Sequence, residues 1–211
     1  MNEVDSHSPN DQAGSLGGRR GRHSHERRHE RDADAGTHHT RYTPTRRRPS
    51  QRPKSFTTRV VTPAVEAARN AGIEYRLHEY EGVEVGEGDY ALAVAAALGV
   101  EPGRLFKTLL ASVDGRLQVF VIPADRRLDL RAIGKRVVMA ERAEAERATG
   151  YVAGGISPLG QRRTLPTTVD EAALAHATIL VSAGRRGLQL ELDPRDLVRL
   201  TDAEVRAVAK E

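Results

Sequence analysis

The sequence predicts a mixed α/β protein, on three observations. Segments with strand-like alternation and segments with helical periodicity follow one another irregularly, which argues against a doubly wound parallel sheet. The pair Asp114-Gly115 lies between two apolar runs and marks an antiparallel hairpin within the sheet. Residues 59–211 are numerous enough to form one domain around a single core.

Residues 1–58 differ in composition from the rest of the chain. They carry 12 of the 33 Lys+Arg residues, 7 of the 29 Asp+Glu residues and six of the eight histidines, with few large apolar side chains. Such a segment buries too little surface to offset the entropy lost on ordering, so we expect a disordered basic extension over 1–58 and a functional domain over 59–211. Three interpretations of the extension stay open: an RNA-affinity arm, a weak His-rich metal binder, or sequence translated upstream of the true start.

The domain itself is nearly neutral, with 21 basic and 22 acidic residues over 59–211. Any RNA contact must therefore come from local patches such as Arg162-Arg163 and Arg185-Arg186. The chain has no cysteine, which excludes disulfides, thiolate catalysis and zinc sites built on sulfur. It has no apolar run of the roughly 20 residues that span a bilayer and no secretory signal, so we expect a cytoplasmic protein without membrane contact.

Helix signals are found at several places. Thr62-Pro63 supplies a capping hydroxyl and a proline at the first helical position, and Gly72 closes this helix. An alanine-rich helix is expected over residues 90–98, ending at Gly99. Thr201-Asp202-Ala203-Glu204 has the pattern of a capping box and predicts the start of a last helix. Two further helices are expected over 141–148 and 171–176.

Strand signals lie between these helices. Residues 73–77 alternate as a strand that leads to His78 and Tyr80. Residues 105–113 and 117–122 form the two arms of the hairpin. Two more strands are expected over 178–182 and 188–192.

The run from Tyr151 to Gln161 predicts a ligand-binding loop. Three glycines and a proline exclude a regular helix or central strand, yet four apolar side chains demand burial. Gly154 and Gly155 leave the main chain accessible to a ligand; the alternative is an ordinary tight turn. The apolar side chains are those of Tyr151, Val152, Ile156 and Leu159.

Lys107 stands out because the chain has only four lysines among its 33 basic residues. Its neighbours on the predicted strand, such as Phe106, are apolar. A lysine in a chain that otherwise uses arginine indicates a need for a compact, strongly hydrated charge. The alternative is a strand lysine that points to solvent, opposite to Phe106.

The chain lacks the residues of common hydrolase sites. His78 and His176 are the only histidines in residues 59–211, and neither has a partner at metal-binding spacing. No serine lies in a G-x-S-x-G pattern. A Ser-His-Asp hydrolase or a zinc hydrolase is therefore not expected.

Several motifs together resemble the YbaK family of Cys-tRNA(Pro) deacylases, which is related to the editing domain of bacterial prolyl-tRNA synthetases. The resemblance runs from about Thr62 to near the C-terminus. It implies a barrel-like mixed β-sheet flanked by helices. The motifs are Phe106-Lys107-Thr108-Leu109-Leu110, Thr149-Gly150-Tyr151, Gly154-Gly155-Ile156-Ser157-Pro158-Leu159-Gly160-Gln161, Leu165-Pro166-Thr167, Val181-Ser182-Ala183-Gly184-Arg185-Arg186-Gly187-Leu188 and Glu191-Leu192.

The resemblance also implies how the site works. The substrate's own cysteine thiol attacks its ester carbonyl, so the protein supplies no nucleophile, no metal and no other cofactor. The protein positions the ester and stabilises the oxyanion. An ordinary strand role is as good an interpretation for Tyr80, Thr108 and Ser182. The implied catalytic groups are Lys107 and the backbone of Gly154, Gly155 and Ile156, and the implied substrate-binding residues are Tyr80, Thr108, Ser157, Ser182, Gly184 and Arg186.

The implied function is trans-editing of Cys-tRNA(Pro), and also of Cys-tRNA(Cys), by a hydrolase, or by a lyase if cyclisation releases the product. The implied partners are the 3′ end of aminoacyl-tRNA and prolyl-tRNA synthetase. Two alternatives stay open: a deacylase that clears alanine or another small amino acid with an activated water, and a non-catalytic module that binds the tRNA 3′ end.

The chain departs from the family pattern in three places, which leaves substrate preference open. Residues 91–94, near the start of the second helix, contain no acid, and Gln189 stands where an acidic residue often follows Gly-Leu. The segment 131–136 replaces a longer helix.

Overall fold

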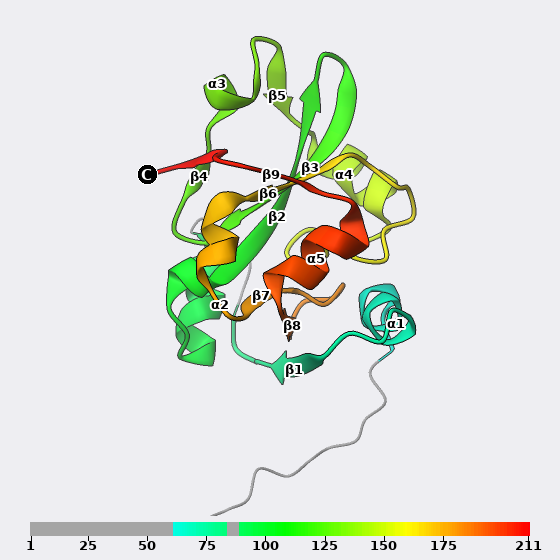
Figure 1. Ribbon diagram of the computed structural model, residues 1–211, viewed down its shortest axis with the longest axis vertical. Coiled ribbons are helices and arrows are strands. Elements are labelled where there is room, and N and C mark those ends of the chain that lie inside the picture. Colours follow the sequence, from blue (N-terminus) through cyan, green and yellow to red (C-terminus); the bar gives the residue numbers. More distant parts are fainter. Residues whose placement is uncertain (1–60, 84–88) are drawn as a thin grey trace, which may run out of the picture. The chain divides into compact units, whose positions relative to one another are not determined.

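A computed structural model describes residues 61–83 and 89–211 (Figure 1). The predicted extension over residues 1–58 lies outside the described residues. In chain order the elements are α1 (Pro63–Asn70), β1 (Tyr75–Glu79), α2 (Tyr90–Leu98), the 3-10 helix η1 (Pro102–Arg104), β2 (Leu105–Val113), β3 (Arg116–Pro123), β4 (Arg127–Leu128), α3 (Leu130–Ile133), β5 (Val137–Met139), α4 (Arg142–Thr149), β6 (Thr167–Asp170), the 3-10 helix η2 (Glu171–Ala175), β7 (Ile179–Ser182), β8 (Leu188–Leu192), α5 (Pro194–Thr201), β9 (Glu204–Arg206) and β10 (Ala209–Lys210).

The predicted mixed sheet, flanked by helices, is confirmed. Its strands follow the order β1-β8-β7-β2-β3-β6-β9, and β5 pairs with β2 beside this path. The β2–β7, β3–β6 and β6–β9 pairs are parallel, whereas the other pairs of this sheet are antiparallel. Strands β4 and β10 form a separate two-stranded sheet. Because the sheet mixes parallel and antiparallel pairs, its connections are hairpins in some places and longer crossovers in others.

The β2–β3 hairpin is confirmed, and its turn residues Asp114 and Gly115 both have positive φ, as a two-residue hairpin turn requires. Strand β3 pairs with β2 along its length, but the other edge of β2 is shared. Strand β7 pairs with β2 only at Leu105 and Phe106, and β5 pairs with it only from Ala111 onward. Residues 107–109 therefore have no strand partner on this edge. In Figure 1 the turn end of the hairpin lies with α3 and β5, away from β1, β7 and β8.

Two of the predicted helices begin and end where local chemistry places them. The Thr62 hydroxyl caps α1 by accepting from the backbone N–H of Val65 at 3.2 Å. Helix α2 matches its prediction and ends at Gly99 with a left-handed φ of 65°. The helix predicted over 171–176 is instead the short 3-10 helix η2. None of the helices in the described part of the chain combines the length and apolarity needed to cross a membrane.

The prediction of a last helix that starts at Thr201 is wrong. Helix α5 begins at Pro194, where the Asp193 carboxylate accepts from the N–H of Arg195 at 2.8 Å, and it ends at Asp202 with a left-handed φ of 47°. The Thr201 hydroxyl donates back to the carbonyl of Leu197 at 2.8 Å. It therefore belongs to the last turn of a helix and does not cap a first turn.

Both faces of the sheet are covered. The main core joins one face to α1, α4 and α5, with Phe106 and Val181 pointing into it. The opposite face, reached by the alternate residues Leu105 and Leu180, packs on α2. Figure 1 shows α5 crossing the sheet and α2 beside the start of β2. The loop over residues 150–166, between α4 and β6, also enters the main core, so it is part of the domain's packing.

Gly160 joins this loop to α1, and we predict that Gly160→Ala is strongly destabilising. The residue has φ of 64°, and a Cβ built on it would overlap the carbonyl of Pro63. Gly115→Ala is the control, because Gly115 also has positive φ but open space around its Cβ position. We expect a loss of about 1–2 kcal/mol for the control, from backbone strain alone, and of more than about 3 kcal/mol for Gly160→Ala. Urea unfolding measures both, and equal losses would contradict the close approach to α1.

Candidate functional site

A cavity of about 380 Å³ opens along the unpaired edge of β2. Its walls come from five places: β2, the start of α2, the β5–α4 connection, the loop over 152–161, and the facing ends of β7 and β8. Most of these side chains are apolar, with a few polar groups among them. The lining consists of Asp89, Tyr90, Ala91, Val94, Leu105, Phe106, Lys107, Thr108, Leu109, Leu110, Met139, Ala140, Arg142, Ala145, Ala153, Gly154, Ile156, Ser182 and Gln189.

The main chain of Thr108 points toward this cavity. The carbonyl of Leu105 accepts from Ala124 on the β3 side, whereas the carbonyl of Leu110 accepts from Ala140 on the opposite side. Because the hydrogen-bonding direction alternates along a strand, the N–H and C=O of Thr108 share the side of Leu110. At this position neither β7 nor β5 pairs with β2.

Lys107 lies at the cavity wall and is held by two acceptors. Its ammonium donates to the carbonyl of Ala124 at 2.8 Å and to the Asp89 carboxylate at 3.1 Å, and its side chain is 19% exposed. The alternative of a lysine that extends into solvent is therefore wrong. Asp89 was missed from the sequence, because the acid was sought within residues 91–94. It is the N-cap of α2 and accepts from the N–H of Ala91 at 3.2 Å. An Asp before an alanine-rich run is the signal that finds it.

Tyr151 fixes the glycine-rich loop from inside. Its hydroxyl donates to the carbonyls of Leu159 at 2.8 Å and Gly160 at 3.1 Å. Burial raises the pKa of Tyr151 to about 12, so the hydroxyl stays protonated as a donor. The burial predicted for Tyr151 and Leu159 is confirmed, and Ile156 is half-buried. Val152 is 53% exposed, so its predicted burial is wrong: it lies on the outside of the turn that the N–H of Gly155 closes.

The two glycine-framed loops touch through their main chains. A Cβ on Gly155 would come within 2.9 Å of the backbone of Arg185. A Cβ on Gly184, which has φ of 91°, would come within 2.7 Å of the Tyr151 ring. Only glycine allows this approach, so the loops form one continuous wall.

The peptide groups of the first loop differ in their hydrogen bonds. The N–H of Gly155 donates to the carbonyl of Val152 at 2.9 Å. Both main-chain polar groups of Ala153 are engaged, because its N–H donates to Glu146 at 2.8 Å and its carbonyl accepts from Arg186 at 2.9 Å. This N–H, aided by Arg142, lowers the pKa of Glu146. The N–H groups of Gly154 and Ile156 have no acceptor within residues 61–83 and 89–211.

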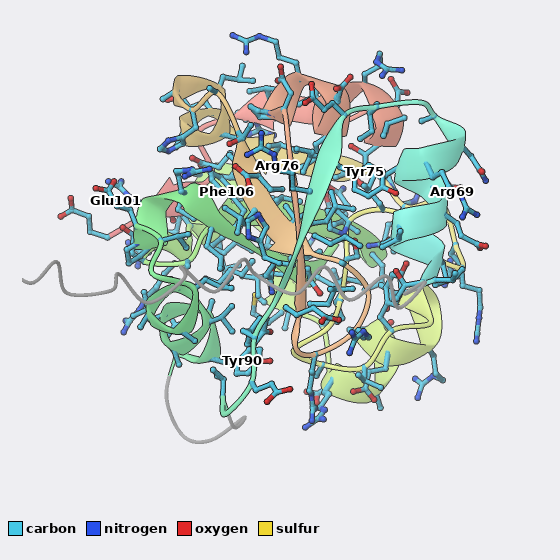
Figure 2. The ribbon with its side chains drawn as sticks, turned by 90° about the horizontal axis from the view of Figure 1, so that it is seen from below. Arg69, Tyr75, Arg76, Tyr90, Glu101 and Phe106 are labelled. Atoms are coloured by element: carbon cyan, nitrogen blue, oxygen red, sulfur yellow. The ribbon has the colours of Figure 1, made fainter. Side chains whose placement is uncertain are left out.

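Two polar atoms of the lining are buried without a partner among the described groups, Thr108 Oγ1 and Gln189 Oε1. Gln189 is 4% exposed, and its amide nitrogen lies 3.5 Å from the Tyr80 hydroxyl. Tyr80 in turn bonds to the Tyr90 hydroxyl at 3.0 Å. Burial and this bond raise the pKa of Tyr90. Figure 2 shows Tyr90 at α2, apart from Arg69 on α1. Because buried polar atoms are rarely unpaired, we expect a water molecule or a ligand to pair with these two atoms.

The predicted site residues are thus divided between the cavity lining and the layer behind it. Lys107, Thr108, Gly154, Ile156 and Ser182 line the cavity. The others lie behind the lining and support it. Ser157 is fully buried, and its hydroxyl accepts from the N–H of Leu159 in a turn within the loop. The remaining members of this supporting layer are Tyr80, Gly155, Gly184 and Arg186.

Neither histidine of the domain reaches the cavity. His78 lies 2.7 Å from Glu191, whose carboxylate also accepts from Thr178 and Arg104, and the bonds from Thr178 and His78 lower the pKa of Glu191. His176 meets the ring of Phe106 edge-on, with 6.5 Å between ring centroids. Across the described ranges, no group of three or more histidine or acidic side chains is placed to hold a metal ion. The cavity offers a cation, free amides and neutral polar atoms for an acyl or phosphate group.

Residues 87–200, which include every residue of the cavity lining, match the model of the aminoacyl-tRNA editing domain. The chain belongs to this family. An Enterococcus faecalis protein named "Putative Cys-tRNA(Pro)/Cys-tRNA(Cys) deacylase EbsC" is 36% identical over an alignment of 156 residues that covers 70% of this chain and 92% of that protein. A proline–tRNA ligase of Acidithiobacillus ferrooxidans is 28% identical over an alignment of 204 residues that covers 92% of this chain and 33% of the ligase.

Solved structures share the fold. The crystal structure of hypothetical protein APE2540 superposes with a TM-score of 0.63 at 29% identity, covering 71% of this chain and 100% of that one. A structure described as a "putative trans-editing enzyme for prolyl tRNA synthetase" superposes with a TM-score of 0.59 at 23% identity, covering 72% and 100%. The resemblance to YbaK-type deacylases and to the prolyl-tRNA synthetase editing domain is confirmed.

The unpaired amide oxygen leads to a prediction for Gln189→Leu. The substitution removes a buried acceptor that has no partner in the described protein, and such an acceptor costs about 1–3 kcal/mol. We expect the free energy of unfolding of the ligand-free protein, measured in urea, to stay unchanged or to rise by up to about 1 kcal/mol. Gln189→Glu, which buries a charge at the same place, is expected to lose stability. A marked loss in Gln189→Leu would show that the oxygen is paired in solution.

Proposed function

We propose that this protein is a trans-editing deacylase that cleaves the ester of tRNA mischarged with cysteine, on Cys-tRNA(Pro) and also on Cys-tRNA(Cys). The observation that carries the proposal is the cavity itself: Lys107 lies on one wall, Gly154 and Ile156 lie on another, and its lining among the described residues contains no histidine. The N–H groups of Gly154 and Ile156 have no acceptor within the described residues. Such a site suits an ester whose own side chain supplies the nucleophile. The name of the Enterococcus relative supports this substrate.

The proposed step is intramolecular. The substrate's cysteine sulfur attacks its ester carbonyl carbon, so that a C–S bond forms and the carbonyl oxygen becomes an oxyanion. The C–O bond to the ribose then breaks, and the thiol proton ends on the ribose oxygen, which leaves as a hydroxyl. Water opens the cyclic thioester. The enzyme is a lyase if its step ends at ring closure, and a hydrolase if the ring opens on the enzyme.

The protein's part is to position and to stabilise. The amides of Gly154 and Ile156 are the proposed oxyanion donors, because both residues line the cavity and neither N–H has an acceptor among the described residues. The N–H of Gly155 is engaged with Val152, so Gly155 contributes the close loop contact instead. Lys107 positions the ester and the terminal phosphate. The hydroxyls of Thr108 and Ser182 meet the ribose or the amino group.

The remaining predicted residues act through the lining. Tyr80 supports Tyr90 and Gln189, whereas Ser157, Gly184 and Arg186 hold the loop wall in place. The domain is nearly neutral, so we propose that tRNA selection is borrowed from prolyl-tRNA synthetase. The proposed location is the cytoplasm, and the proposed step requires no cofactor.

A second candidate is a deacylase for alanine or another small amino acid, which would need an activated water. Asp89 favours it, because its carboxylate lines the cavity and can accept a proton from water. A third candidate is a module that only binds the tRNA 3′ end. The two predictions below separate the three.

Lys107→Met tests the site. It keeps the aliphatic stem but removes the ammonium, and we expect a fall in deacylation rate of about 10²–10³-fold, as for the loss of one preorganised group. The control is Arg69→Met, which removes an exposed cation of α1 that pairs with Glu66 at 3.6 Å. Single-turnover deacylation of Cys-tRNA(Pro) measures both. A wild-type rate in Lys107→Met would overturn the site, whereas binding without any turnover in the wild type would favour the binding module.

Comparison of Cys-, Ala- and Ser-tRNA(Pro) tests the mechanism. Alanine has no nucleophile in its side chain, so we expect hydrolysis of the alanyl ester to be at least about 100-fold slower than that of the cysteinyl ester. Serine, whose hydroxyl is a weaker nucleophile than a thiol, should fall between them. Equal rates for alanine and cysteine would contradict attack by sulfur and support an activated water at Asp89.

A further inference from the structure

A second hollow continues from the cavity across Lys107. It has a volume of about 500 Å³ and shares four lining residues with the cavity, among them Lys107 and Asp89. We call it the β4 groove, because its other wall is β4 and the start of α3. Its lining is Asp89, Lys107, Leu109, Arg127, Leu128, Leu130 and Met139.

The groove combines an apolar floor with a cationic rim. Four of its seven lining residues are leucines or methionine, and Met139 is 40% exposed although it is apolar. The segment 125–136 around it carries five cations against two carboxylates, whereas the rest of residues 59–211 carries 16 cations against 20 carboxylates. Arg127 and Arg131 are exposed and form no ion pair with any described carboxylate.

The opposite rim of the cavity is less suited to phosphate. Arg142 is engaged with Glu146 at 3.1 Å, Arg186 with the carbonyl of Ala153 at 2.9 Å, and Arg185 with Glu79 at 2.9 Å. These three arginines each have a donor engaged within the protein, whereas Arg127 and Arg131 have no partner among the described residues. The pair Arg162 and Arg163, next to the glycine-rich loop, also has no described partner and is the rival path.

We propose that the β4 groove receives the single-stranded 3′ nucleotides of the RNA whose acyl group enters the cavity. The inference rests on the proposed function. An aminoacyl ester is joined to the terminal ribose, so the nucleotides must lie next to the acyl group, and the β4 groove adjoins the cavity at Lys107. Bases have flat apolar faces that pack on Leu130 and Met139, and the phosphates meet Arg127 and Arg131.

Three double variants with the same change in charge test this path. Arg127→Glu with Arg131→Glu removes the proposed contacts. Arg162→Glu with Arg163→Glu removes the basic pair next to the glycine-rich loop, the rival path. Arg69→Glu with Arg76→Glu is the control, on α1 and β1, and Figure 2 shows both residues away from Tyr90. Circular dichroism confirms that each variant is folded.

The first measurement is binding of a fluorescent, unacylated RNA probe, the trinucleotide CCA, by anisotropy at several salt concentrations. We expect the first variant to weaken binding at least tenfold at low salt. The slope of log K against log salt should shrink by about 0.7 for each phosphate that the variant no longer neutralises. The control should stay within about twofold of wild type. Equal weakening by all three variants, or weakening only by the Arg162 and Arg163 pair, would overturn the proposal.

The second measurement separates this inference from the proposed function. With Cys-tRNA(Pro) as substrate, the Arg127 and Arg131 variant should raise KM at least tenfold more than the control does. If the wild type deacylates nothing, the proposed function fails. The CCA binding data still show whether RNA binds in the β4 groove. If the wild type deacylates and the Arg127 and Arg131 variant has the KM of the control, the path is wrong while the function stands.

Discussion

The cavity of this protein opens where two strands that pair with the same edge of β2 leave a gap between them. Strand β7 leaves that edge after Phe106 and β5 reaches it only at Ala111, so the main chain between them has no strand partner there. Such an edge needs water or a ligand to satisfy its hydrogen bonds. Every other feature of the site is arranged around this gap. Helix α2 brings Asp89 and Tyr90 to one side of it, and the glycine-rich loop brings Gly154 and Ile156 to the other.

Charge inside the site is balanced before any ligand arrives. The ammonium of Lys107 has the carbonyl of Ala124 and the carboxylate of Asp89 as partners, which keeps a half-buried cation stable in an apolar wall. The same carboxylate caps α2, so the start of this helix and the position of the lysine depend on one another. An incoming anion therefore meets a cation that is already oriented.

Local signals in the sequence predicted much of the fold. The Thr62 cap, the Asp114-Gly115 turn and the Gly99 stop all act through neighbouring residues, and each lies where it was expected. The last helix was misplaced because Thr201 and Glu204 imitate a capping box, while the true start at Asp193 follows directly on a strand. Val152 was misjudged for a related reason: hydrophobicity does not show which side of a turn faces the core.

The candidate site was predictable only in part. Lys107 and the glycines stand out by residue type, and the family motif places them together. The partnership of Lys107 with Asp89 joins residues 18 positions apart and depends on how α2 packs on β2. The bond between Gly155 and Val152 is a detail of turn geometry that no composition reveals. Long-range contacts and turn conformations therefore supplied what the sequence pattern lacked.

The contacts between the two glycine-framed loops have a consequence for how this scaffold can be altered. The two loops can approach each other because Gly155 and Gly184 have no side chains. The residues that shape this backbone therefore differ from residues whose side chains line the cavity, such as Thr108 and Gln189. Shape and chemistry can then change independently. Substitutions of the lining side chains can change which acyl group fits the cavity while the loop backbone stays intact, provided that the two glycines are kept.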